Sequence, residues 1–272
     1  MSPTTSTTEC IDLEKVLSEK FPGKKFPRFV ISFLNRFLKV EYMNGLISRG
    51  YTGVEFCKEA VKYLGVTVNV EGLDNIPCDG TLYTFASNHP LGGIDGVALA
   101  GIIGERFGSV TMMVNDFLMA LPGLRPLCVP INKVGGQARN LPKMVDESFG
   151  SDKQVLVFPA GKCSRMIDGK IQDIPWNKTF VTKSVQFKRA VVPVHFIGRN
   201  SRRFYKIDRI RKALGIKFNV AMAFLPDEMY RARGKQFKVV FGKPIPYESF
   251  DSEKKAAEWA SSLRSAVYQL QG

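Results

Sequence analysis

Short apolar runs alternate with two-faced segments along most of the chain after Gly65. Eight runs rich in valine, isoleucine and phenylalanine predict strands, at residues 66–70, 82–86, 110–114, 127–131, 154–158, 191–196, 218–224 and 237–241. Helical spacing of apolar residues is found at 95–106, 138–149, 178–188, 201–214 and 252–270. This alternation predicts an α/β fold in which a mostly parallel central sheet is flanked by helices.

The region before Gly65 predicts helices instead of strands. From Arg28 to Val40, apolar residues fill an arc of roughly 200° on a helix, and basic or polar residues fill the remainder. A phenylalanine-rich face opposite a cationic face suits a helix in a lipid headgroup layer, but an amphipathic helix also suits packing on a core. Both alternatives remain open here. A second helix near Val54 to Leu64 is predicted to pair with the first, forming an N-terminal amphipathic helical pair.

The chain is therefore divided into three parts. Residues 1–10 are rich in serine and threonine and are expected to form a disordered tail, and residues 11–64 form a helical membrane-association segment. Residues 65–272 form the α/β domain. The N-terminus shows no apolar core of a signal peptide, and no apolar run reaches the length of about 18 residues that a spanning helix needs. We expect a cytoplasmic protein, peripheral on the inner face of the cytoplasmic membrane.

Charge narrows the choice of partners. The formal net charge is +14, which implies an anionic partner such as membrane phospholipid, an acidic carrier protein or nucleic acid. The sequence has no ribonucleoprotein signature, zinc-ligand spacing or heptad-bearing basic region, so nucleic acid is not expected. Five cysteines without C-x-x-C spacing favour reduced thiols in the cytoplasm. No metal site is expected.

One of only two histidines lies in the turn after the predicted strand 82–86. The segment is Ser-Asn-His-Pro-Leu-Gly-Gly-Ile-Asp-Gly, with His89 and Asp95, and an apolar helix begins after it. A carboxylate that holds one imidazole nitrogen while the other faces a hydroxyl is how a general base is built. The alternative is a loop histidine in a tight turn with a helix-capping aspartate.

Three further blocks follow in order and, with the first, resemble the glycerolipid acyltransferase superfamily, which includes the 1-acylglycerol-3-phosphate acyltransferases. Residues 88–95 are similar to its Asn-His-(four residues)-Asp signature, and residues 158–164 to its Phe-Pro-Glu-Gly-Thr-Arg-Ser block. Residues 192–194 match its Val-Pro-Val strand, and residues 129–133 stand where the family has an Ile-Asp-Arg-like acceptor element. The resemblance covers roughly residues 65–250, and it makes the α/β part, residues 65–272, the acyltransferase domain.

Two departures from the family pattern affect what the resemblance implies. Five residues instead of four separate His89 from Asp95, and the Gly92–Gly93 pair can take up the extra residue because glycine accepts positive φ. Ala160 stands where the family has glutamate. Both departures, with the Gly-Arg-Asn-Ser stretch at 198–201, resemble a divergent branch typical of Bacteroidetes. Some members of that branch resemble O-acyltransferases that finish amino-acid lipids such as glycine lipids.

The resemblance implies an enzyme that moves a fatty acyl group from acyl-ACP or acyl-CoA to the hydroxyl of a lysolipid. His89 would take the proton from the hydroxyl and Asp95 would fix the ring, with no acyl-enzyme and no cofactor. The divergent branch slightly favours a lyso-glycine lipid type of acceptor over 1-acylglycerol-3-phosphate, the default of the superfamily. The longer His-Asp spacing keeps a different class open, an inactive basic protein that binds membrane or nucleic acid.

The resemblance also implies which residues bind substrate: Asn88, Lys133, Gly161, Lys162, Ser164 and Arg165. Within this set the three basic residues form an anion-binding cluster at the ends of strands, and the serine adds a hydroxyl donor. The turn at Gly161 offers a backbone donor to the oxyanion, because no side chain need face the carbonyl there. Cys163 has no histidine near it in sequence and is not expected to be a nucleophile.

Overall fold

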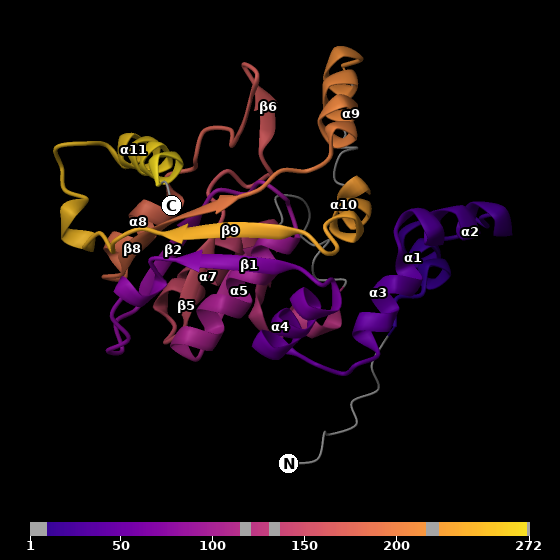
Figure 1. The fold of residues 1–272 in the computed structure, drawn as a ribbon, viewed down its shortest axis with the longest axis horizontal. Coiled ribbons are helices and arrows are strands. Elements are labelled where there is room, and N and C mark those ends of the chain that lie inside the picture. Colours follow the sequence, from indigo (N-terminus) through magenta and orange to yellow (C-terminus); the bar gives the residue numbers. More distant parts are fainter. Residues whose placement is uncertain (1–9, 115–120, 131–136, 216–222, 271–272) are drawn as a thin grey trace.

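The structure, a computed structural model, describes residues 10–114, 121–130, 137–215 and 223–270. Of the predicted disordered tail, residues 1–10, all but the last residue lie outside the described residues. A seven-stranded sheet in the order β1-β9-β8-β2-β5-β3-β4 forms the centre (Figure 1). Its strands are β1 (Thr67–Glu71), β2 (Tyr83–Ser87), β3 (Val110–Val114), β4 (Cys128–Pro130), β5 (Gln154–Val157), β8 (Ala190–Ile197) and β9 (Gln236–Phe241).

Five adjacent strands of this sheet, from β8 to β4, run parallel. Strand β9 is antiparallel to β8, and β1 pairs parallel with β9. The predicted mostly parallel sheet is therefore confirmed. Parallel strands are covered on both faces, and every residue of the central strand β2 is buried. The carboxyl ends of these strands meet at one edge of the sheet, and the turn after β2 leaves from that edge.

Helices cover both faces of the sheet. On one face α5 (Ile94–Phe107) packs against α4 (Gly53–Tyr63), and on the other face α8 (Thr179–Gln186) packs against α11 (Ala256–Gln269) and α7 (Gln137–Gly150). Neighbouring residues of one strand enter different clusters, since Leu156 lies in the α5-side core and Val157 in the α8-side core. Two hydrophobic cores separated by the sheet therefore hold the fold together.

Most predicted helices are confirmed, including α9 (Arg202–Ala213), which follows β8. The predicted strand at 218–224 is wrong where the structure describes it, because residues 223–224 form a helical turn that leads into α10 (Leu225–Arg231). Pro226 lies in the first turn of α10, where its fixed φ suits a helix start. A short hairpin of β6 (Arg165–Ile167) and β7 (Lys170–Gln172) was not predicted, and it stands beside α9 (Figure 1).

The N-terminal region holds three helices before α4: α1 (Leu13–Lys20), α2 (Arg28–Phe37) and α3 (Val40–Ile47). Helix α2 ends earlier than predicted because Lys39 adopts a left-handed conformation with φ of 56°. The predicted pairing of α4 with α2 is wrong, since α4 packs on α5 and α2 contacts α1 and α3. Gly101 and Gly104 of α5 let α4 approach closely, and an added Cβ on Gly104 would lie 2.3 Å from Val54.

Helix α2 extends away from the sheet at the margin of the molecule (Figure 1). None of its residues is buried, and Phe29 and Phe33 are 75% and 66% exposed. Its last residue, Phe37, contacts Phe224 at a ring-centroid distance of 5.0 Å. The rings of Phe29 and Phe33 therefore do not pack on the core, and the C-terminal end of this face contacts the rest of the protein through Phe37. Among the described residues, no helix has the length and apolarity that crossing a bilayer requires.

Candidate active site

The turn that holds His89 is fixed to the neighbouring strand β8 by Asn88. The buried carboxamide of Asn88 donates to the carbonyl of Phe196 at 2.9 Å and accepts from its N–H at 2.7 Å. Through these two hydrogen bonds, the Asn88 side chain continues the pairing between β2 and β8 beyond the last residue of β2. Asn88 therefore positions the turn, since both polar groups of its side chain are engaged by the backbone of β8.

Asp95 lies at the start of α5, and the turn wraps around its carboxylate. Four backbone N–H groups donate to the two carboxylate oxygens, those of Leu91 at 2.8 Å, Gly92 at 3.3 Å, Gly93 at 2.9 Å and Gly96 at 3.0 Å. Gly92 has a φ of +77°, so the prediction that glycine takes up the extra residue at positive φ is confirmed there. The longer spacing still brings the aspartate back to the histidine.

His89 meets Asp95 at ion-pair distance, with 3.0 Å between Nδ1 and Oδ2. The contact lies off the axis of an ideal hydrogen bond, since Nδ1 has no partner by strict geometry. The imidazole also packs on the ring of Phe158, with centroids 4.1 Å apart, and the side chain is 15% exposed. No hydrogen bond from a described residue occupies Nε2, so this nitrogen is left for a substrate.

The electrostatics of this pair suit a general base. Burial, the largest influence, lowers the pKa of His89, but the charge of Asp95 and the contact with it outweigh burial, and the pKa lies above its ordinary 6.5. Burial likewise works to raise the pKa of Asp95, but His89 and the backbone N–H groups hold it below its ordinary value. Asp95 is therefore a carboxylate at neutral pH and stabilises the imidazolium that forms when His89 accepts a proton.

A second buried carboxylate, that of Asp173, forms a hydrogen bond with the backbone of the turn that holds His89. Its Oδ1 accepts from the backbone N–H of His89 at 3.3 Å and from the hydroxyl of Ser164 at 2.6 Å. Its Oδ2 accepts from the indole N–H of Trp176 at 2.9 Å. The backbone N–H of Ser164 in turn donates to the carbonyl of His89 at 2.7 Å. The first and second sequence blocks are thus joined into one hydrogen-bonded unit.

Sequence analysis did not identify Asp173 as a site residue. The available signal was an aspartate between apolar neighbours, Ile171 to Trp176, and a buried carboxylate needs partners. Asn200 was also missed as an individual residue. Its amide donates to the carbonyls of Pro90 at 3.3 Å and Leu91 at 3.2 Å, which ties the segment after β8 to the same turn.

The other predicted substrate-binding residues lie in different surroundings. Gly161 is exposed, with a φ of +63°, but its N–H donates to the carbonyl of Phe158 at 2.8 Å, so this predicted donor to the oxyanion is already engaged within the protein. Lys162 is exposed next to it, and Ser164 is buried against Asp173. Lys133 lies outside the described residues. Four residues of the predicted site belong to one hydrogen-bonded group: His89, Asp95, Asn88 and Ser164. Gly161 and Lys162 lie in the exposed turn that follows β5.

Arg165 is buried, and the fold surrounds its guanidinium with partners. Its Nη1 donates to the carbonyl of Cys163 at 2.9 Å, its Nε lies 3.5 Å from a carboxylate oxygen of Asp208, and its charge lies 5.4 Å from the ring centroid of Phe204. Burial raises the pKa of Cys163 to about 11, against the lowering influence of Arg165. The thiol of Cys163 is therefore protonated at neutral pH and is a weak nucleophile.

We expect Asp173→Asn to lower kcat by about tenfold, the effect of losing one charge-assisted hydrogen bond. The charge of Asp173 also helps to raise the pKa of His89, so the acidic limb of the rate profile should move to lower pH. Rate–pH profiles and melting curves measure both effects. Asp168→Asn, at an exposed position in the β6–β7 hairpin, is the matched control and should change neither. A lower melting temperature with an unmoved acidic limb would show a merely structural role.

Comparison with known proteins identifies the same family that the four sequence blocks resemble. The family model described as Acyltransferase matches residues 15–271. A "Lyso-glycine lipid O-acyltransferase" from Bacteroides thetaiotaomicron is 51% identical over 265 residues, which cover 96% of this chain and 97% of the relative. A relative of the same name from Phocaeicola vulgatus is 50% identical over 266 residues, covering 96% and 95%. The solved 1-acyl-sn-glycerophosphate acyltransferase PlsC from Thermotoga maritima is 19% identical, with a TM-score of 0.49, covering 94% and 86%.

Proposed function

The chain belongs to the acyltransferase family, and from this premise we propose that it moves a fatty acyl group from a thioester to the hydroxyl of a lyso-amino-acid lipid of the glycine-lipid type. The observation on which the mechanism rests is the pair formed by His89 and the buried Asp95 at the tip of β2. The acceptor class is supported by the two lyso-glycine lipid relatives, which match nearly the full length of the chain. The retained pair argues against an inactive binding protein.

In the proposed reaction, Nε2 of His89 takes the proton of the acceptor hydroxyl as its oxygen attacks the thioester carbonyl. The attack forms a tetrahedral intermediate with an oxyanion, which collapses to re-form the carbonyl as the ester of the acceptor. The carbon–sulfur bond breaks in this collapse, and the thiolate leaves with the proton that the imidazolium returns. Asp95 stabilises the imidazolium between these two steps. Positioned acid–base catalysis of this kind contributes about 10²–10⁴-fold. The buried, protonated Cys163 has no part, so the acyl group passes directly from donor to acceptor.

We assign binding of the acceptor head group to the exposed end of the second block. Lys162 is exposed beside Gly161, which has no side chain to block approach to the backbone. Lys133 is proposed as the second cation on the basis of its sequence position. Arg165 is assigned to holding the block in place, because Asp208 and Phe204 contact its guanidinium. The competing acceptor, 1-acylglycerol-3-phosphate, carries a phosphate that the same cations would also attract.

Deletion of the gene in its host, followed by lipid profiling, tests the acceptor. We expect loss of the diacylated amino-acid lipid and accumulation of its lyso form, while phosphatidic acid and its derivatives stay unchanged. Expression of the wild-type chain should restore the lipid, and the His89→Ala variant should not. Accumulation of 1-acylglycerol-3-phosphate with an unchanged amino-acid lipid would overturn the assignment.

We further propose that α2 binds the surface of an anionic membrane, which makes the protein peripheral on the inner face of the cytoplasmic membrane. Phe29 and Phe33 are largely exposed, and Phe33 stacks on Phe37 at 6.1 Å, so aromatic rings line one side of the helix. Arg28 and Arg36 on α2 add positive charge. Apolar insertion and roughly 1 kcal/mol per basic residue near an anionic leaflet together favour this orientation.

Phe29→Asp combined with Phe33→Asp is expected to release the protein from anionic vesicles without changing its melting temperature, because neither ring is buried. Activity on a long-chain, vesicle-resident acceptor should fall much more than activity on a short-chain, soluble one. Val70→Asp combined with Val185→Asp changes charge equally at exposed positions and should still sediment with vesicles. Continued sedimentation of the phenylalanine variant would contradict membrane binding through α2.

A further inference from the structure

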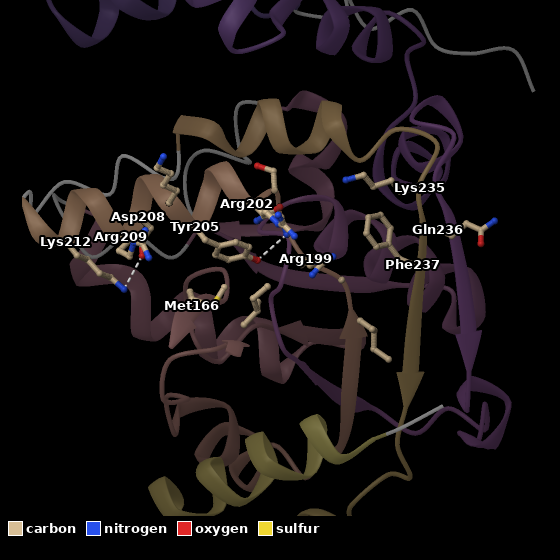
Figure 2. Close-up of a pocket in the computed structure, with 16 residues that line it drawn as sticks. Met166, Arg199, Arg202, Tyr205, Asp208, Arg209, Lys212, Lys235, Gln236 and Phe237 are labelled. Atoms are coloured by element: carbon tan, nitrogen blue, oxygen red, sulfur yellow. Dashed lines mark hydrogen bonds and ion pairs between the residues drawn. The ribbon is translucent and has the colours of Figure 1, made fainter. Parts of the chain in front are cut away.

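Helix α9, the end of β8 and the start of β9 enclose a cleft of about 790 Å³ that does not include the His89–Asp95 pair (Figure 2). Apolar side chains form part of its lining, from Met166, Ile171, Ile197, Tyr205 and Phe237. The hairpin β6–β7 supplies the first two of these, so elements far apart in sequence build the cleft together. An extended ligand of mixed polarity fits such a lining.

The charged lining of the cleft is almost entirely basic. Six cationic side chains line it: Arg199, Arg202, Lys206, Arg209, Lys212 and Lys235. The single carboxylate of the lining is Asp208, which is already engaged by Arg165, Arg211 and Lys212 at 3.5, 3.0 and 3.1 Å. Within the described part of the chain, none of the other five cations forms an ion pair. Several like charges without counter-charges attract a polyanion.

The cations form a row that begins beside the catalytic turn. Arg202, Lys206 and Arg209 are spaced i, i+4 and i+7, so they lie on one face of α9, and Figure 2 shows the basic side chains of α9 along the cleft. From Arg202 to Lys212 the helix rises about 15 Å. At the near end Asn200 donates to two carbonyls of the turn that contains His89. The row therefore leads from that turn outward.

We propose that this cleft binds the phosphate-bearing pantetheine arm of the acyl thioester donor. The inference rests on the proposed acyl transfer, in which the thioester must reach His89. The arm is long and of mixed polarity, with methyl and methylene groups between two amides and a phosphate at its far end, which matches a partly apolar lining bordered by cations. The same arm occurs in coenzyme A and in acyl carrier protein, so the chemistry is shared. The concave shape favours an inserted arm over a flat lipid surface.

The test reverses two charges, in the variant Lys206→Glu with Arg209→Glu, both of which are exposed. Its matched control is Lys153→Glu with Lys243→Glu, two exposed lysines at the opposite edge of the sheet, before β5 and after β9. Binding of free coenzyme A and of holo-acyl carrier protein is measured by calorimetry without acceptor. Donor KM, acceptor KM and kcat are then measured with acyl-CoA and with acyl carrier protein as donors.

We expect binding of both probes to weaken by about tenfold or more in the cleft variant, as for reversed charge-assisted contacts. The donor KM should rise in parallel, while acceptor KM, kcat and melting temperature stay as in the wild type and the control. An effect confined to the carrier-protein donor would place the basic contact on the surface of the carrier protein instead of on the shared arm, and would overturn the proposal. Unchanged donor binding, or a loss of vesicle sedimentation with donor binding intact, would overturn the proposal.

These outcomes separate the cleft from the acceptor assignment. Binding of coenzyme A is measured without acceptor, so a charge-dependent loss supports the cleft even if lyso-glycine lipid is not acylated. Conversely, normal acylation of lyso-glycine lipid with unchanged donor KM in the cleft variant would retain the proposed function and reject the cleft.

Discussion

His89→Ala is expected to lower kcat by about 10²–10⁴-fold, the contribution of a positioned general base. The reason is geometric: one ring nitrogen faces Asp95 at 3.0 Å, and the other is left for the acceptor hydroxyl. Turnover is measured with purified protein, saturating acyl donor and a lysolipid acceptor. Vesicle sedimentation should be unchanged, because α2 lies away from the turn.

The second histidine of the chain provides the control for this loss. Nδ1 of His195 lies 2.9 Å from the carbonyl of Leu270, so the ring holds the end of α11 and has a structural role. His195→Asn keeps a donor for that carbonyl and should retain transfer. Near-normal turnover of His89→Ala, with a melting curve like that of the wild type, would rule out the proposed base.

Asp95→Asn is expected to lower kcat/KM by about tenfold or more, but by less than His89→Ala, because orientation is impaired while the base is retained. Four backbone N–H groups point at the carboxylate, and an amide NH₂ cannot accept their hydrogen bonds. A lower melting temperature should therefore accompany the kinetic loss. Rates are compared per folded protein, so that the two effects are separated.

The pH profile of kcat/KM tests whether the charge of Asp95 raises the pKa of His89. His89 acts as a base only when neutral, and its pKa lies above 6.5, so wild-type activity should fall as pH drops through a value above 6.5. In Asp95→Asn the main influence that raises the pKa is lost and burial, which lowers it, remains. The acidic limb should then move to lower pH. An acidic limb at the same pH in both proteins would contradict the assigned roles.

Much of the fold could be predicted from sequence because the sheet is parallel and covered on both faces. Strands such as 82–86 and 191–196 are apolar apart from Thr84 and His195, and such runs are detected without knowledge of the neighbouring strands. The partner of a helix is not encoded in its own periodicity. Helices α2 and α4 are both amphipathic, and the close approach of α4 to α5 depends on Gly101 and Gly104, which lie elsewhere in the sequence. The sequence predicts the phenylalanine face of α2, but it does not predict that this face is exposed to solvent.

The site could be predicted where its residues are close in sequence. His89 and Asp95 belong to one turn, so their contact follows from local chain geometry. Asp173 contacts the backbone of His89 across 84 residues, and this depends on the path of the whole chain. For the same reason the sequence could not show that Asp208 of α9 reaches Arg165. Long-range polar contacts require the packed fold.

The central claim is that the protein acylates an amino-acid lipid with His89 as the general base, and one competition experiment tests it most directly. Purified protein receives limiting acyl donor with equal amounts of lyso-glycine lipid and 1-acylglycerol-3-phosphate, and the two products are quantified by mass spectrometry. The product ratio equals the ratio of the two kcat/KM values. We predict that the glycine-lipid product exceeds phosphatidic acid by about tenfold or more. His89→Ala should form both products about 10²–10⁴-fold more slowly. Phosphatidic acid as the main product, or glycine-lipid product formed equally by His89→Ala, would contradict the account.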